Sequence, residues 1–182
     1  HFTGASGGTI YAGDAFPEEF YGNIFTGEVA GNLVHRDVLE PHSSSPKYIA
    51  KRADKEKERE FISSTDSWFR PTEFSVGPDG NLYMVDMYRQ HIETPISIPE
   101  DLLVDMDYTK AMDMGRIYRI VPKDRKKSDF SLTAKKDKNT MDYVKLLEHP
   151  NQWWRLQAQK QLLERQDKSI VPSLVELFNL ST

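Results

Sequence analysis

The sequence contains no cysteine, so neither a disulfide, a thiolate metal site nor a covalent haem attachment can form within these 182 residues. No apolar run approaches the roughly 20 residues of a membrane helix, and no basic and apolar leader opens the chain. The charges are mixed, with a formal net charge of -4 and no basic block. We therefore expect no membrane span in this chain and no nucleic-acid partner.

An initiating methionine is also absent, since the chain opens at His1. This start indicates a piece of a longer protein, and it leaves the cellular compartment open. With 38% hydrophobic residues, the chain can still bury a core in one domain or two small ones.

Short β-favouring runs alternate with Gly, Pro, Asp and Asn turns from residue 7 to about residue 122. This spacing is typical of antiparallel meanders, and no long helix fits into it. The predicted strands are Gly8–Ala12, Asn23–Thr26, Leu33–Leu39, Lys47–Lys51, Glu73–Val76, Leu82–Asp86 and Arg116–Val121.

A weak internal repeat organises these strands. The run starting at Gly22-Asn23 matches the run starting at Gly80-Asn81, and the two runs end at an acid, Glu28 or Asp86. The following strands match at a larger offset, so the second unit holds 25 extra residues between its second and third strands. Periodic β units imply a solenoid or a propeller. We expect a partial β-propeller of about two blades of antiparallel four-stranded sheet, with three strands of the second blade present.

The pattern changes to a helical period over residues 140–178. Thr140 and Asn151 are predicted caps of two helices, Pro172 fits the first turn of a third, and Trp154, Leu147 and Leu162 should pack them together. Stacked helical pairs need about three repeats to bury a shared core, so the array should continue beyond Thr182. The predicted organisation is propeller blades at 1–122, an exposed linker at 123–139 and the start of a helical repeat at 140–182.

The segment STDSWFRPTEFSVGPDGNLYMVDMYRQHIETP (Ser64–Pro95), with GNLVHRDVLEP before it and GRIYRI after it, resembles the membrane-bound dehydrogenase family, whose propellers are similar to glucose/sorbosone dehydrogenases. LLEHPNQWWRLQAQKQLLERQD extends the resemblance beyond residue 122. It implies an exported or periplasmic protein with a propeller, HEAT-like repeats and often a cytochrome c domain. This chain holds no Cys-x-x-Cys-His segment, so haem would belong to the longer parent protein.

Two loops carry the candidate site residues. In a propeller, the loop that enters the first strand of a blade and the loop that joins its second and third strands emerge on the same face, where ligands usually bind. The first loop supplies Asp66, Trp68 and Arg70, and the second supplies Asp86, Tyr88, Arg89 and His91.

Arg70 and Arg89 could fix a carboxylate of a pyrroloquinoline quinone-type cofactor or of a sugar acid. The alternative, which we favour, is a pair of ion pairs with Asp66 or Asp86 that brace the loops. Trp68 could stack on a cofactor or sugar ring, or serve as a core anchor between blades, which is the favoured alternative.

His91 is the candidate general base, because its ordinary pKa lies near neutrality, although a loop histidine is more often structural. Asp66, Asp86 and Tyr88 would bind substrate. We expect no metal site, since Gly77–Asn81 is a β-turn that lacks the ligand spacing of a calcium loop. The charged run Asp54–Glu60 should be a solvated helix or loop.

Two functions remain open. The chain is either the C-terminal propeller portion of a quinone-type sugar or aldose dehydrogenase, or a non-catalytic module that binds carbohydrate or protein. A closed ring needs about 4 to 8 blades. We therefore expect an inactive isolated chain, whose partners are the missing blades and repeats of its parent and a sugar ligand. Its open strand edge and blade faces should drive self-association unless the helices cover them.

Overall fold

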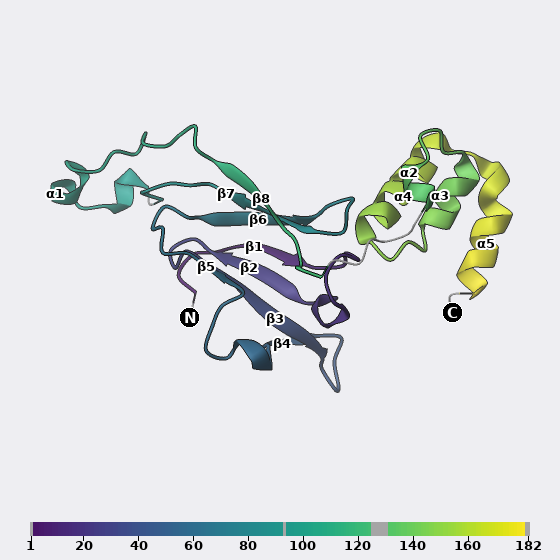
Figure 1. Ribbon diagram of the computed structural model, residues 1–182, viewed down its shortest axis with the longest axis horizontal. Helices are drawn as coiled ribbons and strands as arrows, with labels where there is room; N and C mark the ends of the chain where they lie inside the picture. The colour runs from purple at the N-terminus through teal and green to yellow at the C-terminus, as the bar shows by residue number, and fades with distance from the viewer. Residues whose placement is uncertain (1, 93, 125–130, 181–182) are drawn as a thin grey trace. The chain divides into compact units, whose positions relative to one another are not determined.

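The computed structural model describes residues 2–92, 94–124 and 131–180. Two open antiparallel sheets precede a helical segment (Figure 1), which confirms the predicted fold class and is consistent with a partial propeller. The chain divides into two compact units. One comprises His1–Tyr11, Phe20–Ser75 and Leu82–Ile120, and the other comprises Ala12–Glu19, Val76–Asn81 and Val121–Thr182.

The first sheet is an antiparallel meander in the order β1-β2-β3-β4, and a short strand, β5, also pairs with β3. β4 pairs with the second half of β3, whereas β5 pairs with its first two residues. Its strands are β1 (Ala5–Ile10), β2 (Ile24–Glu28), β3 (Leu33–Pro41), β4 (Tyr48–Arg52) and β5 (Ile62–Ser63).

The second sheet has three strands in the order β6-β7-β8, namely β6 (Pro71–Val76), β7 (Leu82–Asp86) and β8 (Arg116–Ile120). All seven predicted strands occur within a few residues of their predicted bounds. The sequence analysis missed β5, because a two-residue strand has no periodic pattern and depends on its pairing with Leu33 and Val34.

The two sheets pack closely through β1, β2 and β6. Ser6 donates its hydroxyl hydrogen to the Thr72 carbonyl at 2.9 Å, and a Cβ at Gly27 would collide with the Pro71 carbonyl. The core of this unit includes Phe25 and Val34, which have no exposed surface.

The internal repeat has a structural basis at its turns. Gly22 and Gly80 precede β2 and β7 with φ of 79° and 75°, a left-handed conformation that glycine adopts without strain. The residues that follow, Asn23 and Asn81, are both buried. The two matched segments are therefore the second strands of their meanders.

An acidic residue at the end of the second strand binds backbone amides in each repeat, and we call Glu28 and Asp86 the acid clamps. Glu28 accepts hydrogen bonds from the backbone of Thr3 and Gly4 at 2.8 Å and of Ala30 at 3.1 Å. Asp86 Oδ1 accepts from the backbone of Arg70 at 2.8 Å and of Tyr88 at 2.9 Å. Each acid thus joins the chain before the first strand to the residue two positions beyond itself.

The run Asp54–Glu60 is not wholly solvated, contrary to expectation. It begins with a 3-10 helix, Asp54–Glu56, and Glu56 is buried in an ion pair with Arg36, whose Nη2 lies 2.8 Å from Oε1. Glu60 binds His35 and Arg52, each at 2.7 Å. This run lies beside His35 and Arg36, the residues in the middle of β3 that pair with neither β4 nor β5. Because successive strand residues point to opposite faces of a sheet, these two side chains reach different acids of the run.

The 25-residue excess of the second unit lies between β7 and β8. Apart from a 3-10 helix at Pro95–Ser97 and the short helix α1 (Glu100–Leu103), its described part is irregular. The acids of this segment include Glu100 and Asp101, which are exposed, as expected.

The helical segment contains α2 (Ser131–Ala134), α3 (Thr140–Leu146), α4 (Gln152–Arg165) and α5 (Val171–Leu180). Asn139, not Thr140, caps α3 in a capping box with Asp142, and Asn151 caps α4 as predicted. α2 falls in the predicted linker 123–139, of which residues 125–130 lie outside the described residues.

The core of the helical unit is centred on Leu146, Ala158 and Ile170, which are buried. The predicted contact residues Trp154, Leu147 and Leu162 are only half-buried. The indole N–H of Trp154 donates to the Pro78 carbonyl at 2.9 Å. No helix in the described residues has the length and apolarity to cross a bilayer.

Candidate functional site

The two loops that carry the candidate residues are joined side by side by hydrogen bonds. The amide of Met87 donates to the Arg70 carbonyl at 3.0 Å, and the amide of Arg89 donates to the Trp68 carbonyl at 3.1 Å. Asp86 adds the side-chain bond to the Arg70 amide. The structure therefore brings the two loops together.

Arg70 fixes these loops through backbone carbonyls. Its Nε donates to Arg89 at 2.9 Å, its Nη1 to Val29 at 2.6 Å and its Nη2 to Gln90 at 2.8 Å. Three of the five N–H donors of a guanidinium are thus committed to the backbone. This arrangement is that of a structural brace.

Arg89 performs a similar task inside the insertion. Its guanidinium donates to the carbonyls of Ala111 and Met112, the latter at 3.1 Å. Throughout the described residues, neither arginine forms an ion pair with Asp66 or Asp86. The favoured alternative was that ion pairs of the two arginines brace the loops. The arginines do brace the loops, but they bind backbone carbonyls instead of carboxylates.

The two candidate acids differ in exposure. Asp86 is completely buried in its acid clamp, and its Oδ2 has no hydrogen-bond partner in the described part of the chain. Asp66 is exposed, and its Oδ1 accepts a hydrogen bond from the Trp68 amide at 3.0 Å, which shapes the loop. Asp66 alone can reach a ligand from solvent without rearrangement of the loops.

An aromatic–cation cluster, which we define as Trp68, Tyr88, Lys110 and Arg116, lies at the junction of the loops. The rings of Trp68 and Tyr88 are 5.7 Å apart and tilted. Lys110 Nζ lies 5.0 Å from the centre of the Trp68 ring, and the Arg116 guanidinium lies 3.7 Å from that of Tyr88. Trp68 is half-buried in this chain.

The backbone of Tyr88 has an uncommon left-handed conformation, with φ of 51°. A bulky residue in the left-handed region is strained, and such strain gathers at functional sites. The Asp86 bond to the Tyr88 amide helps to hold this conformation. The position of this ring is therefore imposed by the fold.

His91 lies on the same loop but contacts a different ring. Its imidazole is half-buried and tilted against Tyr108 at 5.7 Å. Within the described ranges, neither ring nitrogen has a hydrogen-bond partner, and its ring contact is with Tyr108 and not with Trp68 or Tyr88. The structure thus separates His91 from the aromatic–cation cluster.

Lys110 and Arg116 were missed by sequence reasoning. Lys110 stands in an insertion without periodicity, and Arg116 begins a strand that was predicted without any role for its side chain. The match of Gly115–Arg119 to the first unit could have pointed to Arg116, since it places this residue at the end of the insertion.

A family model described as "Domain of unknown function (DUF7133)" matches residues 1–124. The chain belongs to the DUF7133 family. No curated protein matches the chain, and no solved structure does. The matched residues include both sheets and the insertion, so the candidate site lies wholly within DUF7133. The dehydrogenase relationship stays a prediction.

The DUF7133 region does not fit the quinone clamp that the resemblance implies, as far as its two arginines are concerned. Arg70 and Arg89 would have to exchange backbone carbonyls for a cofactor carboxylate, and those bonds hold the loops together. No described group of three or more His, Asp or Glu side chains could hold a metal ion.

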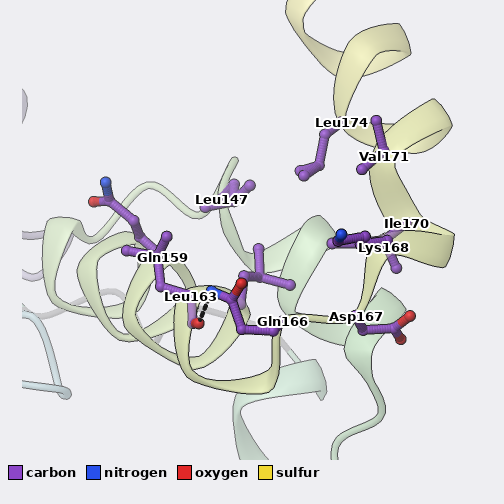
Figure 2. A pocket seen from close by; sticks show the side chains of 10 residues that line it. Leu147, Gln159, Leu163, Gln166, Asp167, Lys168, Ile170, Val171 and Leu174 are labelled. Carbon is purple, nitrogen blue, oxygen red and sulfur yellow. Dashed lines mark hydrogen bonds between the residues drawn. The ribbon is translucent and has the colours of Figure 1, made fainter.

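A separate apolar hollow, of about 310 Å³, lies in the helical unit outside the DUF7133 match. Figure 2 shows Leu147, Leu163, Val171 and Leu174 around it, with Gln166 donating to the Leu163 carbonyl at 2.6 Å. Leu163 is 62% exposed, so the hollow opens to solvent. Its charged lining residues are Asp167, whose carboxylate accepts hydrogen bonds from the amide and the hydroxyl of Ser169, and Lys168.

Proposed function

We propose that the DUF7133 region of this chain is a carbohydrate-binding portion of a β-propeller, with its ligand on the aromatic–cation cluster. One observation carries the proposal, namely that loops fixed by backbone hydrogen bonds present the half-buried pair Trp68 and Tyr88. A flat aromatic face suits the apolar face of a sugar ring, and rigid placement lowers the entropy lost on binding.

The polar groups around the pair can fix the orientation of a sugar. Asp66 is exposed beside Trp68, and the cationic groups of Lys110 and Arg116 lie over the two rings. Ligand sites commonly combine aromatic walls with a few such polar groups. Hydroxyl groups of a sugar can donate to the Asp66 carboxylate and accept from the cations.

The proposal includes the setting that the resemblance implies. The remaining blades and further HEAT-like repeats would come from a longer, exported or periplasmic protein. In the second sheet, Ile117 is 72% exposed and Val85 is 39% exposed, which supports either a neighbouring blade or self-association of the isolated chain. Light scattering at several concentrations measures the self-association.

Substitution of the tryptophan tests the binding proposal. Calorimetric titration with a panel of neutral and acidic oligosaccharides should detect a ligand, and Trp68→Ala should weaken its binding about tenfold or more, because the stacking surface is lost. Trp153→Phe in the helical unit is the matched control and should bind like the unchanged chain. The proposal fails if no oligosaccharide binds, or if Trp68→Ala binds as tightly as the control.

A second candidate, a part of a sugar dehydrogenase, is favoured by His91. Its ring is half-buried with no hydrogen bond in the described part of the chain, so it is free to accept a hydroxyl proton. We derive no step through the quinone, because the arginines do not fit its clamp. The 182-residue chain with added quinone should not oxidise aldoses. A longer protein with all its blades should do so, and undiminished activity of its His91→Ala variant would exclude this role.

A further inference from the structure

The two cations of the aromatic–cation cluster have no carboxylate partner. Across residues 2–92, 94–124 and 131–180, no Asp or Glu oxygen lies within ion-pair distance of Lys110 or Arg116. Both residues are exposed, and the Arg116 side chain interacts with the hydroxyl groups of Tyr118, at 3.4 Å, and of Tyr88. Their charges therefore face solvent uncompensated by a direct contact.

Asp113, which lies three residues from each cation, is exposed and forms no ion pair with either of them in the described residues. Three other carboxylates of these loops accept hydrogen bonds from the protein itself. Asp107 Oδ1 accepts from the amide and the hydroxyl of Thr109, at 2.9 Å and 2.6 Å, and Asp66 Oδ1 accepts from the Trp68 amide. Asp86 is buried within its acid clamp. The fold thus uses these acids in turns and loop contacts. Asp107 also interacts with Lys110, through the Lys110 backbone amide and at longer range through its charge, but it forms no ion pair with the Lys110 side chain.

The rings hold the cations without satisfying their hydrogen-bond donors. A cation over an aromatic face is attracted by the ring quadrupole, whereas its N–H groups still need acceptors. The end of the insertion that carries Lys110 is fixed as well, because Arg89 binds the carbonyls of Ala111 and Met112. Two cationic groups are thereby held ready beside the stacking surface.

We propose that the carbohydrate recognised here is acidic, with its ring on Trp68 or Tyr88 and its carboxylate or sulfate group bound by Arg116 and Lys110. This inference rests on the proposed carbohydrate-binding function. A guanidinium binds either anion through two parallel hydrogen bonds, and the lysine ammonium adds a second charge.

The test compares three trisaccharides of galactose type in calorimetric titrations of the 182-residue chain. One is tri-galacturonate, one is a sulfated galactotriose, and one is neutral galactotriose. At least one acidic probe should bind about tenfold or more tightly than the neutral probe, and the stronger of the two identifies the anion. Arg116→Gln and Lys110→Gln should each remove most of this preference, because each should weaken the binding of the acidic probe far more than that of the neutral probe. Lys47→Gln removes one exposed cation of the first sheet and is the charge-matched control.

The outcomes separate this inference from the function on which it rests. If the neutral probe binds as tightly as both acidic probes, the acidic preference is wrong and carbohydrate binding stands. If no probe in the wider panel binds, the proposed function fails, and the inference fails with it. If Lys47→Gln lowers acidic binding as much as Arg116→Gln does, the attraction is one of net charge and the assigned site is refuted.

Discussion

The two sheets share a framework but differ in the connection between their second and third strands. Both have a left-handed glycine before the second strand and an acid clamp at its end. Residues 29–32 suffice to connect β2 to β3, whereas residues 87–115 connect β7 to β8. The shared residues are those that the backbone requires. Lys110 lies in the part of the connection that the first sheet lacks, whereas Tyr88 stands where the first sheet has Ala30.

The two sheets also use their cations differently. In the first sheet, Arg36 and Arg52 form ion pairs with acids of the run beside β3. In the second sheet and its loops, Arg70 and Arg89 bind carbonyls, and Arg116 stacks on a ring. This comparison indicates that charge in the first sheet stabilises an irregular edge, while charge in the second sheet and its loops can serve a ligand.

Glu56→Ala should have the largest effect, because it leaves Arg36 buried without its partner. The Arg36 side chain is 5% exposed, its guanidinium donates hydrogen bonds to the Glu56 carboxylate, and it stacks on the Phe20 ring. Removal of one partner from a buried pair costs about 3–5 kcal/mol. Urea denaturation measures the loss, with the exposed Glu58→Ala as control. Equal stabilities of the two variants would mean that Arg36 is solvated in solution.

Gly22 and Gly80, which stand at equivalent positions before β2 and β7, should differ in how much stability an added Cβ costs. Gly22→Ala should cost about 1–2 kcal/mol for its left-handed backbone, because nothing lies within 4 Å of the added Cβ. Gly80→Ala should cost about 1–3 kcal/mol more, since its Cβ would lie 2.8 Å from the Ala15 amide nitrogen and collide with Asp14. Thermal unfolding of both variants checks the order. A greater loss for Gly22→Ala would contradict it.

Much of the fold could be predicted because its signals are local. Strand alternation, turn residues and the Gly-Asn repeat gave the seven longer strands and their grouping into four and three. The pairing of Arg36 with Glu56 was not predictable, because it depends on the path of residues 53–61 past β3. A charged run has the same sequence pattern whether or not one member is buried.

The candidate site was only partly predictable for a related reason. Propeller topology predicts that the loops holding Trp68 and Tyr88 emerge on the same face, and the structure joins these loops by hydrogen bonds. The carbonyl partners of Arg70 leave no trace in the sequence, since every residue has a carbonyl. The position of Lys110 over Trp68 requires the three-dimensional path of an insertion without periodicity.

If the two acid clamps play the same part in the repeat, their removal should lower the free energy of unfolding by similar amounts. Glu28→Ala and Asp86→Ala each remove a buried acceptor of backbone amides and should each cost about 1–3 kcal/mol. The exposed acids Glu18 and Asp113, changed to Ala, are the controls. Urea denaturation gives the four values. A clamp variant as stable as its control would show that this acid is not needed for the fold of its unit.

The smallest expected effect is a pH dependence specific to the first sheet. Burial raises the pKa of Glu60, but hydrogen bonds from Arg52 and His35 outweigh it and hold the pKa below its ordinary value. A carboxyl group whose pKa is lower in the folded than in the unfolded chain stabilises the fold above its unfolded pKa of about 4.3, and this stabilisation is lost as the pH falls through the folded pKa. The free energy of unfolding should therefore fall on acidification below about pH 5.

Glu60→Gln should remove about 0.5–1 kcal/mol of that dependence, as expected for a partly exposed ion pair. Arg52→Gln should raise the pKa of Glu60 toward its ordinary value, because it removes the stronger of the two favourable hydrogen bonds. Urea denaturation between pH 3 and pH 7 measures the first effect, and an NMR titration of the Glu60 carboxyl carbon measures the second. Identical pH profiles for the unchanged chain and Glu60→Gln would mean that the ion pair beside β3 contributes no net stability. In that case, the contrast between charge that supports the fold and charge that is left for a ligand would depend on Arg36 and Glu56 alone.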